Sequence, residues 1–115
     1  MAIVTLLTDS GESDHYIAAI KARSLAVDPS LSIIDISHQI RMFDIGHAAF
    51  VLRSVFHDFP KGTVHLVGVD AAGNRDDAFI FMKLEDHFFV GADNGLFSLV
   101  SDHPPENIWQ INPDT

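Results

Sequence analysis

The sequence of 115 residues contains no cysteine, and its seven lysine and arginine residues stand against 16 aspartate and glutamate residues, a formal net charge of −9. Without cysteine the chain can form neither a disulfide nor a thiolate metal site, and a reducing compartment is permitted. So few basic residues cannot neutralise the phosphates of a nucleic acid or of an anionic membrane surface. We therefore expect neither as a partner.

Long apolar runs are also absent from the sequence. No run reaches the roughly 18 residues that a membrane-spanning helix needs, and the N-terminus lacks the basic flank of a signal peptide. We therefore expect a soluble protein of the cytoplasm. Apolar residues nevertheless make up 47% of the chain, which is typical of a globular protein and enough for the core of one domain.

The order of apolar runs and helix-forming segments predicts an α/β fold. The expected strands are 2–7, 31–36, 63–69, 78–84, 87–91 and 108–111, and the expected helices are 14–27, 44–59 and 96–100. Strands that alternate with helices and then form a hairpin indicate three layers. These are a mostly parallel central sheet, helices on both of its faces, and a C-terminal hairpin that turns at Glu85-Asp86.

The two long helices are expected to pack on the sheet through apolar faces. In the second helix, Asp44 is expected as the N-cap, apolar residues follow at intervals of three or four, and Pro60 ends the helix. In the first helix, the apolar positions predict a wide face made by Ile17, Ala18, Ile20, Ala22, Leu25 and Val27.

An acidic loop, residues 8–16, joins the first strand to the first helix. It contains Asp9, Glu12 and Asp14 and no basic residue. Open α/β sheets bind ligands at the carboxyl ends of their strands, and a phosphate site would place glycines and a lysine here. The loop therefore favours a ligand with hydroxyl groups and positive charge. The alternative is that Asp9 only forms a turn and that Ser13 or Asp14 only caps the helix.

Other polar residues follow the later strands. Asp70 ends the strand at 63–69, and Arg75, five residues later, can pair with it, although an exposed ion pair of this kind stabilises little. Phe43 would ordinarily be a core residue or a hydrophobic staple, and Asp93-Asn94-Gly95 is typical of a turn. The seven histidines show no metal-binding spacing such as H-E-x-x-H. The residues themselves thus predict an acidic cleft for a small molecule, without naming that molecule.

Several motifs follow one another along the chain. The first is Ile3-Val4-Thr5-Leu6-Leu7-Thr8-Asp9-Ser10-Gly11-Glu12-Ser13-Asp14-His15-Tyr16. The others, in order, are Ile34-Asp35-Ile36-Ser37-His38, Asp44-Ile45, Ala48-Ala49-Phe50, Phe59-Pro60-Lys61-Gly62-Thr63-Val64-His65, Val69-Asp70 and Phe89-Val90-Gly91-Ala92-Asp93-Asn94-Gly95-Leu96. In sequence and in order, these motifs resemble those of the S-adenosylmethionine (SAM) hydroxide adenosyltransferases, which hydrolyse SAM to adenosine and are related to fluorinating and chlorinating enzymes.

The resemblance implies hydrolysis of SAM to adenosine and L-methionine by water or hydroxide attack at the 5′-carbon. It implies that Asp9 binds the ribose hydroxyls, that Asp14 lies near the methionine amino group, and that Phe43 lies against the ribose. Asp70 and Arg75 would handle the attacking water together with a histidine of a second domain. The family further implies a homotrimer whose substrate lies between subunits. SAM is then the substrate, and no cofactor or metal is implied.

The chain departs from the family pattern at two places and suggests a domain boundary at its end. Ser10 stands where the family usually has Phe, and the loop from Asp70 to Arg75 lacks the usual Pro-Gly and is two residues shorter. Residues 112–115 carry no closing signal, so we expect 1–115 to be the N-terminal domain of a two-domain family, with the C-terminal domain absent.

Three alternative functions are compatible with these residues. The first is a catalytically inactive nucleoside- or SAM-binding module, which the altered loops permit. The second is a SAM-dependent halogenase of the same fold. The third is a metal-dependent hydrolase that uses Asp9, Asp14 and His15.

Overall fold

The computed structural model describes residues 2–11, 15–69 and 79–111. Its elements follow the predicted order, with boundaries close to those expected from the sequence. They are β1 (Ile3–Thr8), α1 (Tyr16–Val27), β2 (Ser32–Ser37), α2 (Ile45–Val55), the 3-10 turn η1 (Phe56–Asp58), β3 (Val64–Gly68), β4 (Phe79–Leu84), β5 (His87–Ala92), the 3-10 turn η2 (Phe97–Leu99) and β6 (Asn107–Ile111).

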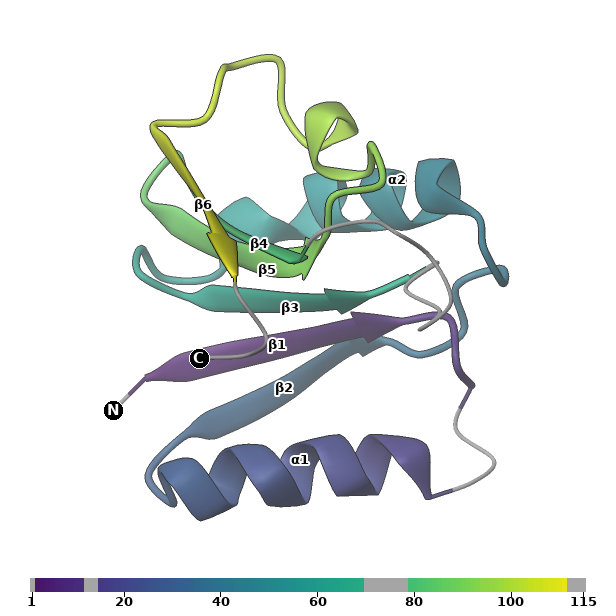
Figure 1. The fold of residues 1–115 in the computed structure, drawn as a ribbon, viewed down its shortest axis with the longest axis vertical. Helices are drawn as coiled ribbons and strands as arrows, with labels where there is room; N and C mark the ends of the chain where they lie inside the picture. Colours follow the sequence, from purple (N-terminus) through teal and green to yellow (C-terminus); the bar gives the residue numbers. More distant parts are fainter. Residues whose placement is uncertain (1, 12–14, 70–78, 112–115) are drawn as a thin grey trace.

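The strands form one mixed sheet in the order β2-β1-β3-β5-β4-β6. Strands β2, β1, β3 and β5 pair in parallel, whereas β4 is antiparallel to β5 and to β6. The crossovers from β1 to β2 and from β2 to β3 run in opposite directions along the sheet. Right-handed crossovers of this kind place their helices on opposite faces, and Figure 1 shows α1 and α2 on opposite sides of the strands. The predicted α/β fold class is confirmed.

The hairpin of β4 and β5 closes through a two-residue turn. Leu84 pairs with His87, and the residues between them, Glu85 and Asp86, have φ angles of 50° and 65°. Positive φ at both central positions is typical of a type I′ turn, whose twist matches that of the flanking strands. The turn predicted at Glu85-Asp86 is confirmed.

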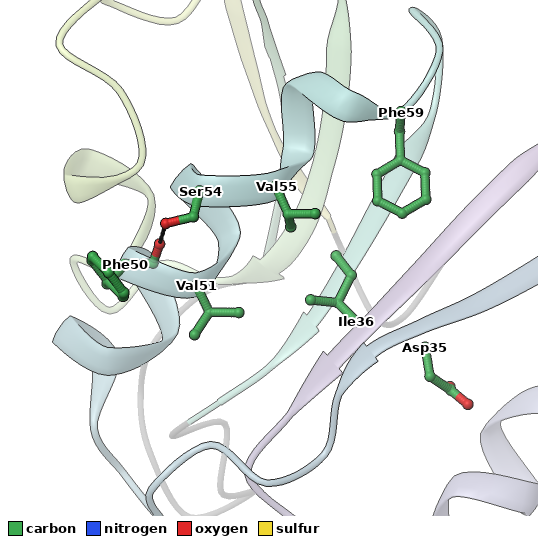
Figure 2. A pocket seen from close by; sticks show the side chains of 7 residues that line it. All are labelled: Asp35, Ile36, Phe50, Val51, Ser54, Val55 and Phe59. Carbon is green, nitrogen blue, oxygen red and sulfur yellow. Dashed lines mark hydrogen bonds between the residues drawn. The ribbon is translucent and has the colours of Figure 1, made fainter.

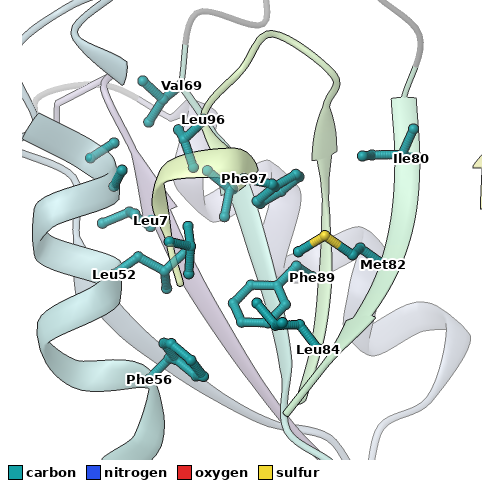
Figure 3. Packing of buried hydrophobic residues seen from close by; sticks show 14 of the residues in the cluster. Leu7, Leu52, Phe56, Val69, Ile80, Met82, Leu84, Phe89, Leu96 and Phe97 are labelled. Carbon is teal, nitrogen blue, oxygen red and sulfur yellow. The ribbon is translucent and has the colours of Figure 1, made fainter. Parts of the chain in front are cut away.

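The hydrophobic core lies between α2, η2 and the face of the sheet that they cover (Figure 3). The Asp44 carboxylate accepts a hydrogen bond of 2.9 Å from the amide of His47, which confirms the predicted N-cap. Leu52, Phe56 and Phe89 are fully buried there, and burying each such side chain contributes about 1.5–3 kcal/mol.

Helix α1 contributes much less to the core, so the wide apolar face predicted for it is wrong. Ile17 is its buried residue, and Val27 is 88% exposed. The apolar side chains are spread around the helix, so that only one narrow stripe can meet the sheet. An ion pair of 2.7 Å between Lys21 and Asp35 adds to that contact. Within the described part of the chain, neither helix is long and apolar enough to cross a membrane.

Candidate functional site

The carboxyl ends of the parallel strands β1, β2, β3 and β5 meet at one edge of the sheet. This carboxyl edge brings together the segment after β1, the loop after β2, the end of β3 and the turn after β5. In open α/β sheets such an edge forms the ligand crevice. The polar side chains of these loops are therefore the first candidates for a binding site.

Asp9 lies at the centre of this edge, directly after β1. It is partly buried, and its Oδ2 accepts a hydrogen bond of 2.9 Å from the backbone amide of Phe43. Its own amide donates to the carbonyl of Gly68 at the end of β3, over 3.4 Å. Asp9 therefore connects the loops that follow β1 and β2, and the orientation of its carboxylate is set by the neighbouring loop.

Phe43 is held in a conformation that is costly for its residue type. Its φ angle is +61°, in the left-handed region, where a residue with a side chain pays on the order of 1–3 kcal/mol. Phe43 is 58% exposed, so the ordinary expectation of a core residue is wrong. Backbone strain and an exposed aromatic residue are both typical of a ligand site.

His38 belongs to the same edge and was not recognised as a site residue from the sequence. It is 2% exposed, its Nδ1 lies 2.8 Å from the hydroxyl of Thr8, and its Nε2 lies 2.8 Å from Oδ1 of Asp35. The other oxygen of Asp35 accepts from the ammonium group of Lys21 at 2.7 Å. The only sequence signal was the presence of Asp35 and His38 in one family motif, which carries no information about their partners.

The pKa of Asp35 follows from this environment. Partial burial acts most strongly and raises the pKa, but hydrogen bonds from Lys21 and His38 and the charge of Lys21 together bring it below its ordinary value. Asp35 is therefore ionised at neutral pH and acts only as an acceptor toward both partners.

Asn94 closes the edge on the side of β5. Its Nδ2 donates to the carbonyl of Val69 over 3.0 Å, and its Oδ1 accepts from the amide of Leu96 over 3.2 Å. Gly95 has a φ of +94°, so the predicted turn is confirmed. Asn94 also ties the end of β5 to the end of β3, a contact that the sequence pattern did not indicate.

Three predicted site residues, Asp14, Asp70 and Arg75, lie outside the described residues. Val69, the residue before Asp70, is 1% exposed at the end of β3, which agrees with a strand that leads to this edge. Across the described ranges 2–11, 15–69 and 79–111, no group of three or more histidine, aspartate or glutamate side chains could hold a metal ion.

A separate apolar groove of about 410 Å³ lies between β2 and α2 (Figure 2). Its lining residues are Asp35, Ile36, Phe50, Val51, Ser54, Val55 and Phe59. The hydroxyl of Ser54 donates to the carbonyl of Phe50 over 2.6 Å, and the carboxylate of Asp35 is engaged by Lys21 and His38. Since its polar side chains are engaged in this way, the groove offers mainly apolar contact, and the carboxyl edge remains the better site for a polar ligand.

Comparison with known proteins identifies the family to which the chain is similar. The family model of the SAM hydroxide adenosyltransferase N-terminal domain matches residues 4–115. The (R)-S-adenosyl-L-methionine hydrolase of Methanocaldococcus jannaschii is 36% identical over 105 residues, which cover 87% of this chain and 40% of that protein. The enzyme of the same name from Thermus thermophilus is 32% identical over 115 residues, covering 98% and 44%.

A halogenating enzyme and a solved structure extend the comparison. A fluorinase of Nocardia brasiliensis is 32% identical over 62 residues, which cover 54% of this chain and 21% of that protein. The crystal structure of an uncharacterized conserved protein from Thermotoga maritima matches with a TM-score of 0.89 and 35% identity, covering 95% of this chain and 42% of that one. The chain spans less than half the length of the curated relatives that it matches. It belongs to the SAM hydroxide adenosyltransferase family, through the N-terminal domain of that family.

Proposed function

We propose that this chain forms the substrate-binding part of an enzyme that hydrolyses SAM to adenosine and L-methionine. Relatives named (R)-S-adenosyl-L-methionine hydrolase, 36% and 32% identical, support the reaction. The observation that carries the proposal is the carboxylate of the partly buried Asp9, oriented by the backbone amide of Phe43 at 2.9 Å, in a loop where Phe43 itself is 58% exposed.

The proposed chemistry suits an acidic site. SAM carries a sulfonium and an ammonium against one carboxylate, and the chain has a net charge of −9. A carboxylate has about four acceptor positions, so Asp9 can accept from ribose hydroxyls in addition to Phe43. Asp14 is proposed to lie near the methionine amino group, and the ring of Phe43 against the ribose.

The sulfonium is a good leaving group, so the protein chiefly has to hold water in line with the 5′-carbon. Asp70 and Arg75 are proposed to orient that water, with a histidine of a second domain. Because an aspartate beside a guanidinium is a weaker base, Asp70 positions the water more than it deprotonates it. Neither a metal nor another cofactor is required for this step.

The proposed active assembly is a cytoplasmic homotrimer in which SAM lies between one subunit's N-terminal domain and its neighbour's second domain. The test is chromatographic detection of adenosine and methionine after incubation of the full-length protein with SAM, with and without a chelator. We expect equal amounts of both products, unaffected by the chelator. SAM binding without turnover would instead indicate a binding module, and loss of activity with the chelator would indicate a metal-dependent hydrolase.

The fluorinase relative supports halogenation as a second candidate. The same assay in the presence of fluoride or chloride distinguishes a hydrolase from a halogenase, since a halogenase would form a 5′-halogenated nucleoside in place of adenosine.

We also expect residues 1–115 alone to release no adenosine, because the second half of the site is supplied by the rest of the assembly. Adenosine release at the full-length rate by this fragment would contradict a shared site.

A further inference from the structure

We propose that His38 is a positioning residue that holds the Asp9 segment in its binding conformation, an inference that rests on the proposed SAM-binding role of Asp9. His38 contacts that segment on both sides of Asp9. Its Nδ1 lies 2.8 Å from the hydroxyl of Thr8, and its backbone carbonyl accepts a hydrogen bond of 2.8 Å from the amide of Gly11. Asp9 and Ser10 lie between these two contacts.

A third hydrogen bond completes the connection between the two loops. The amide of Phe43 donates to Oδ2 of Asp9 over 2.9 Å, and Phe43 lies in the same loop after β2 as His38. The Asp9 segment is therefore held by a side chain, a backbone carbonyl and a backbone amide of one neighbouring loop. Movement of His38 would shift the carboxylate relative to the bound ribose.

The partners of His38 determine which of its nitrogens carries the proton. Asp35 can only accept, so Nε2 of His38 donates to it over 2.8 Å. In the tautomer with its proton on Nε2, Nδ1 has a lone pair and accepts from the hydroxyl of Thr8 over 2.8 Å. Lys21 holds Asp35 from the other side at 2.7 Å. A carboxylate that fixes the orientation of a histidine also helps to fix the position of the groups that the histidine contacts.

The hydrogen bonds of this network extend through the Thr8 hydroxyl to Ser10. Since the Thr8 hydroxyl donates to His38, its oxygen is available to accept from the Ser10 hydroxyl, which lies 3.0 Å away. The network thus orients the residues on both sides of Asp9. Because Thr8 and His38 are each only 2% exposed, water does not readily replace either partner.

The chain offers a matched control for this network on the same strand. Thr5, three residues before Thr8 on β1, contacts Nδ1 of His65 at 2.7 Å and is fully buried. His65 packs among Phe56, Phe59 and Phe89, away from the carboxyl edge. Thr8→Val and Thr5→Val therefore each remove one buried Thr–His hydrogen bond. Thr8→Val also removes the contact between the Thr8 and Ser10 hydroxyls, so only this variant removes contacts to the Asp9 segment, and the His38 variants separate the contribution of His38 from that of Ser10.

The first measurement does not depend on substrate. Amide hydrogen exchange of Gly11 and Phe43 reports the two backbone hydrogen bonds between the loops. In the full-length protein, we expect Thr8→Val to speed exchange of both amides by about tenfold, the effect of weakening a contact by one hydrogen bond. Thr5→Val should leave the exchange rates of both amides unchanged. It should lower the melting temperature by about as much as Thr8→Val does. Unchanged exchange at Gly11 and Phe43 in Thr8→Val would overturn the proposal.

The second measurement is the dissociation constant for SAM. We expect Thr8→Val to raise it by about tenfold and Thr5→Val to leave it unchanged. His38→Asn, whose side-chain oxygen can replace Nδ1 as the acceptor for Thr8, should bind SAM more tightly than His38→Gln. Equal weakening by the two threonine variants would assign His38 a purely structural role and overturn the proposal. If the wild-type protein neither binds nor hydrolyses SAM, the proposed function fails, and amide exchange still decides the role of His38.

Discussion

Strand β1 carries two buried threonine–histidine pairs that look alike locally and differ in what surrounds them. Thr5 contacts His65 at 2.7 Å, and Thr8 contacts His38 at 2.8 Å. The second partner of His65 is another imidazole, His87, at 3.1 Å, whereas the second partner of His38 is the carboxylate of Asp35 at 2.8 Å. The first pair lies among aromatic rings in the interior, and the second lies at the carboxyl edge of the sheet.

The partner of each histidine determines what its pair can do. Burial, and next the charge of His87, lower the pKa of His65 to about 4, so at neutral pH this pair is an uncharged part of the core. His38 instead faces an acceptor that selects one tautomer and is itself ionised. Only the second pair continues into the segment that carries Asp9, through the contact between the Thr8 and Ser10 hydroxyls. The hydroxyl–imidazole contact alone therefore does not indicate function.

The largest effect is expected at Asp9, the residue that the His38 network holds. In the full-length protein, Asp9→Ala should weaken SAM binding by about 1.5–3 kcal/mol, because charged hydrogen bonds to ribose hydroxyls are lost. Asp9→Asn keeps an oxygen that can accept from Phe43 and should retain the loop contact while losing the charge. Calorimetric titration of both variants measures the difference. Unchanged affinity in Asp9→Ala would remove Asp9 from the site.

A pH-dependent loss of stability is expected from the interior pair. The folded pKa of His65, about 4, lies below its ordinary value of about 6.5. The unfolded state therefore binds a proton more readily as the pH falls through 6.5, and stability decreases until the pH reaches about 4. Between pH 7 and pH 5 this amounts to about 2 kcal/mol. Urea unfolding at both values, compared with His65→Gln, isolates this contribution; an equal pH dependence in the variant would contradict it.

The sequence predicted those parts of the molecule that depend on local patterns. The element order, the turn at Glu85-Asp86 and the Asp44 N-cap follow from apolar spacing and turn chemistry within a few residues. Asp9 was placed at the carboxyl edge because it directly follows a strand. The wide apolar face of α1 was wrong because that pattern does not state which side of a helix meets the sheet.

Other features depend on contacts between distant residues, and the sequence could not show them. Thr8 and His38 meet only because β1 and β2 pair in parallel with the register that aligns Leu6 with Asp35. The positive φ of Phe43 occurs together with its contact to Asp9, and nothing in a phenylalanine indicates positive φ. The contact between Thr8 and His38 and the positive φ of Phe43 are therefore seen only in the structure, where the strands are paired.

A smaller effect is expected at Phe43, with opposite signs for stability and binding. Phe43→Gly removes the cost of a left-handed conformation, worth about 1 kcal/mol, so the melting temperature should rise by a few degrees. The affinity for SAM should fall, because the exposed ring no longer lies against the ribose. Thermal unfolding and titration on the same sample test both signs. A lower melting temperature would mean that the ring contributes more to folding than the strain costs.

The smallest effect is expected at Lys21, the far end of the His38 network. Its ion pair with Asp35 is partly exposed, with 33% and 37% of the two side chains accessible, so Lys21→Met should cost no more than about 1 kcal/mol of stability. Lys83→Met is the matched control, because Lys83, on β4, forms a comparably exposed pair with Glu106 at 3.4 Å, at the edge of the sheet opposite β2. Both variants should unfold at similar urea concentrations. If Asp35 depends on Lys21 to orient His38, only Lys21→Met should weaken SAM binding, by about twofold, the equivalent of a few tenths of a kcal/mol. Equal affinities in the two variants would mean that Asp35 orients His38 without Lys21, and the network would then end at the carboxylate.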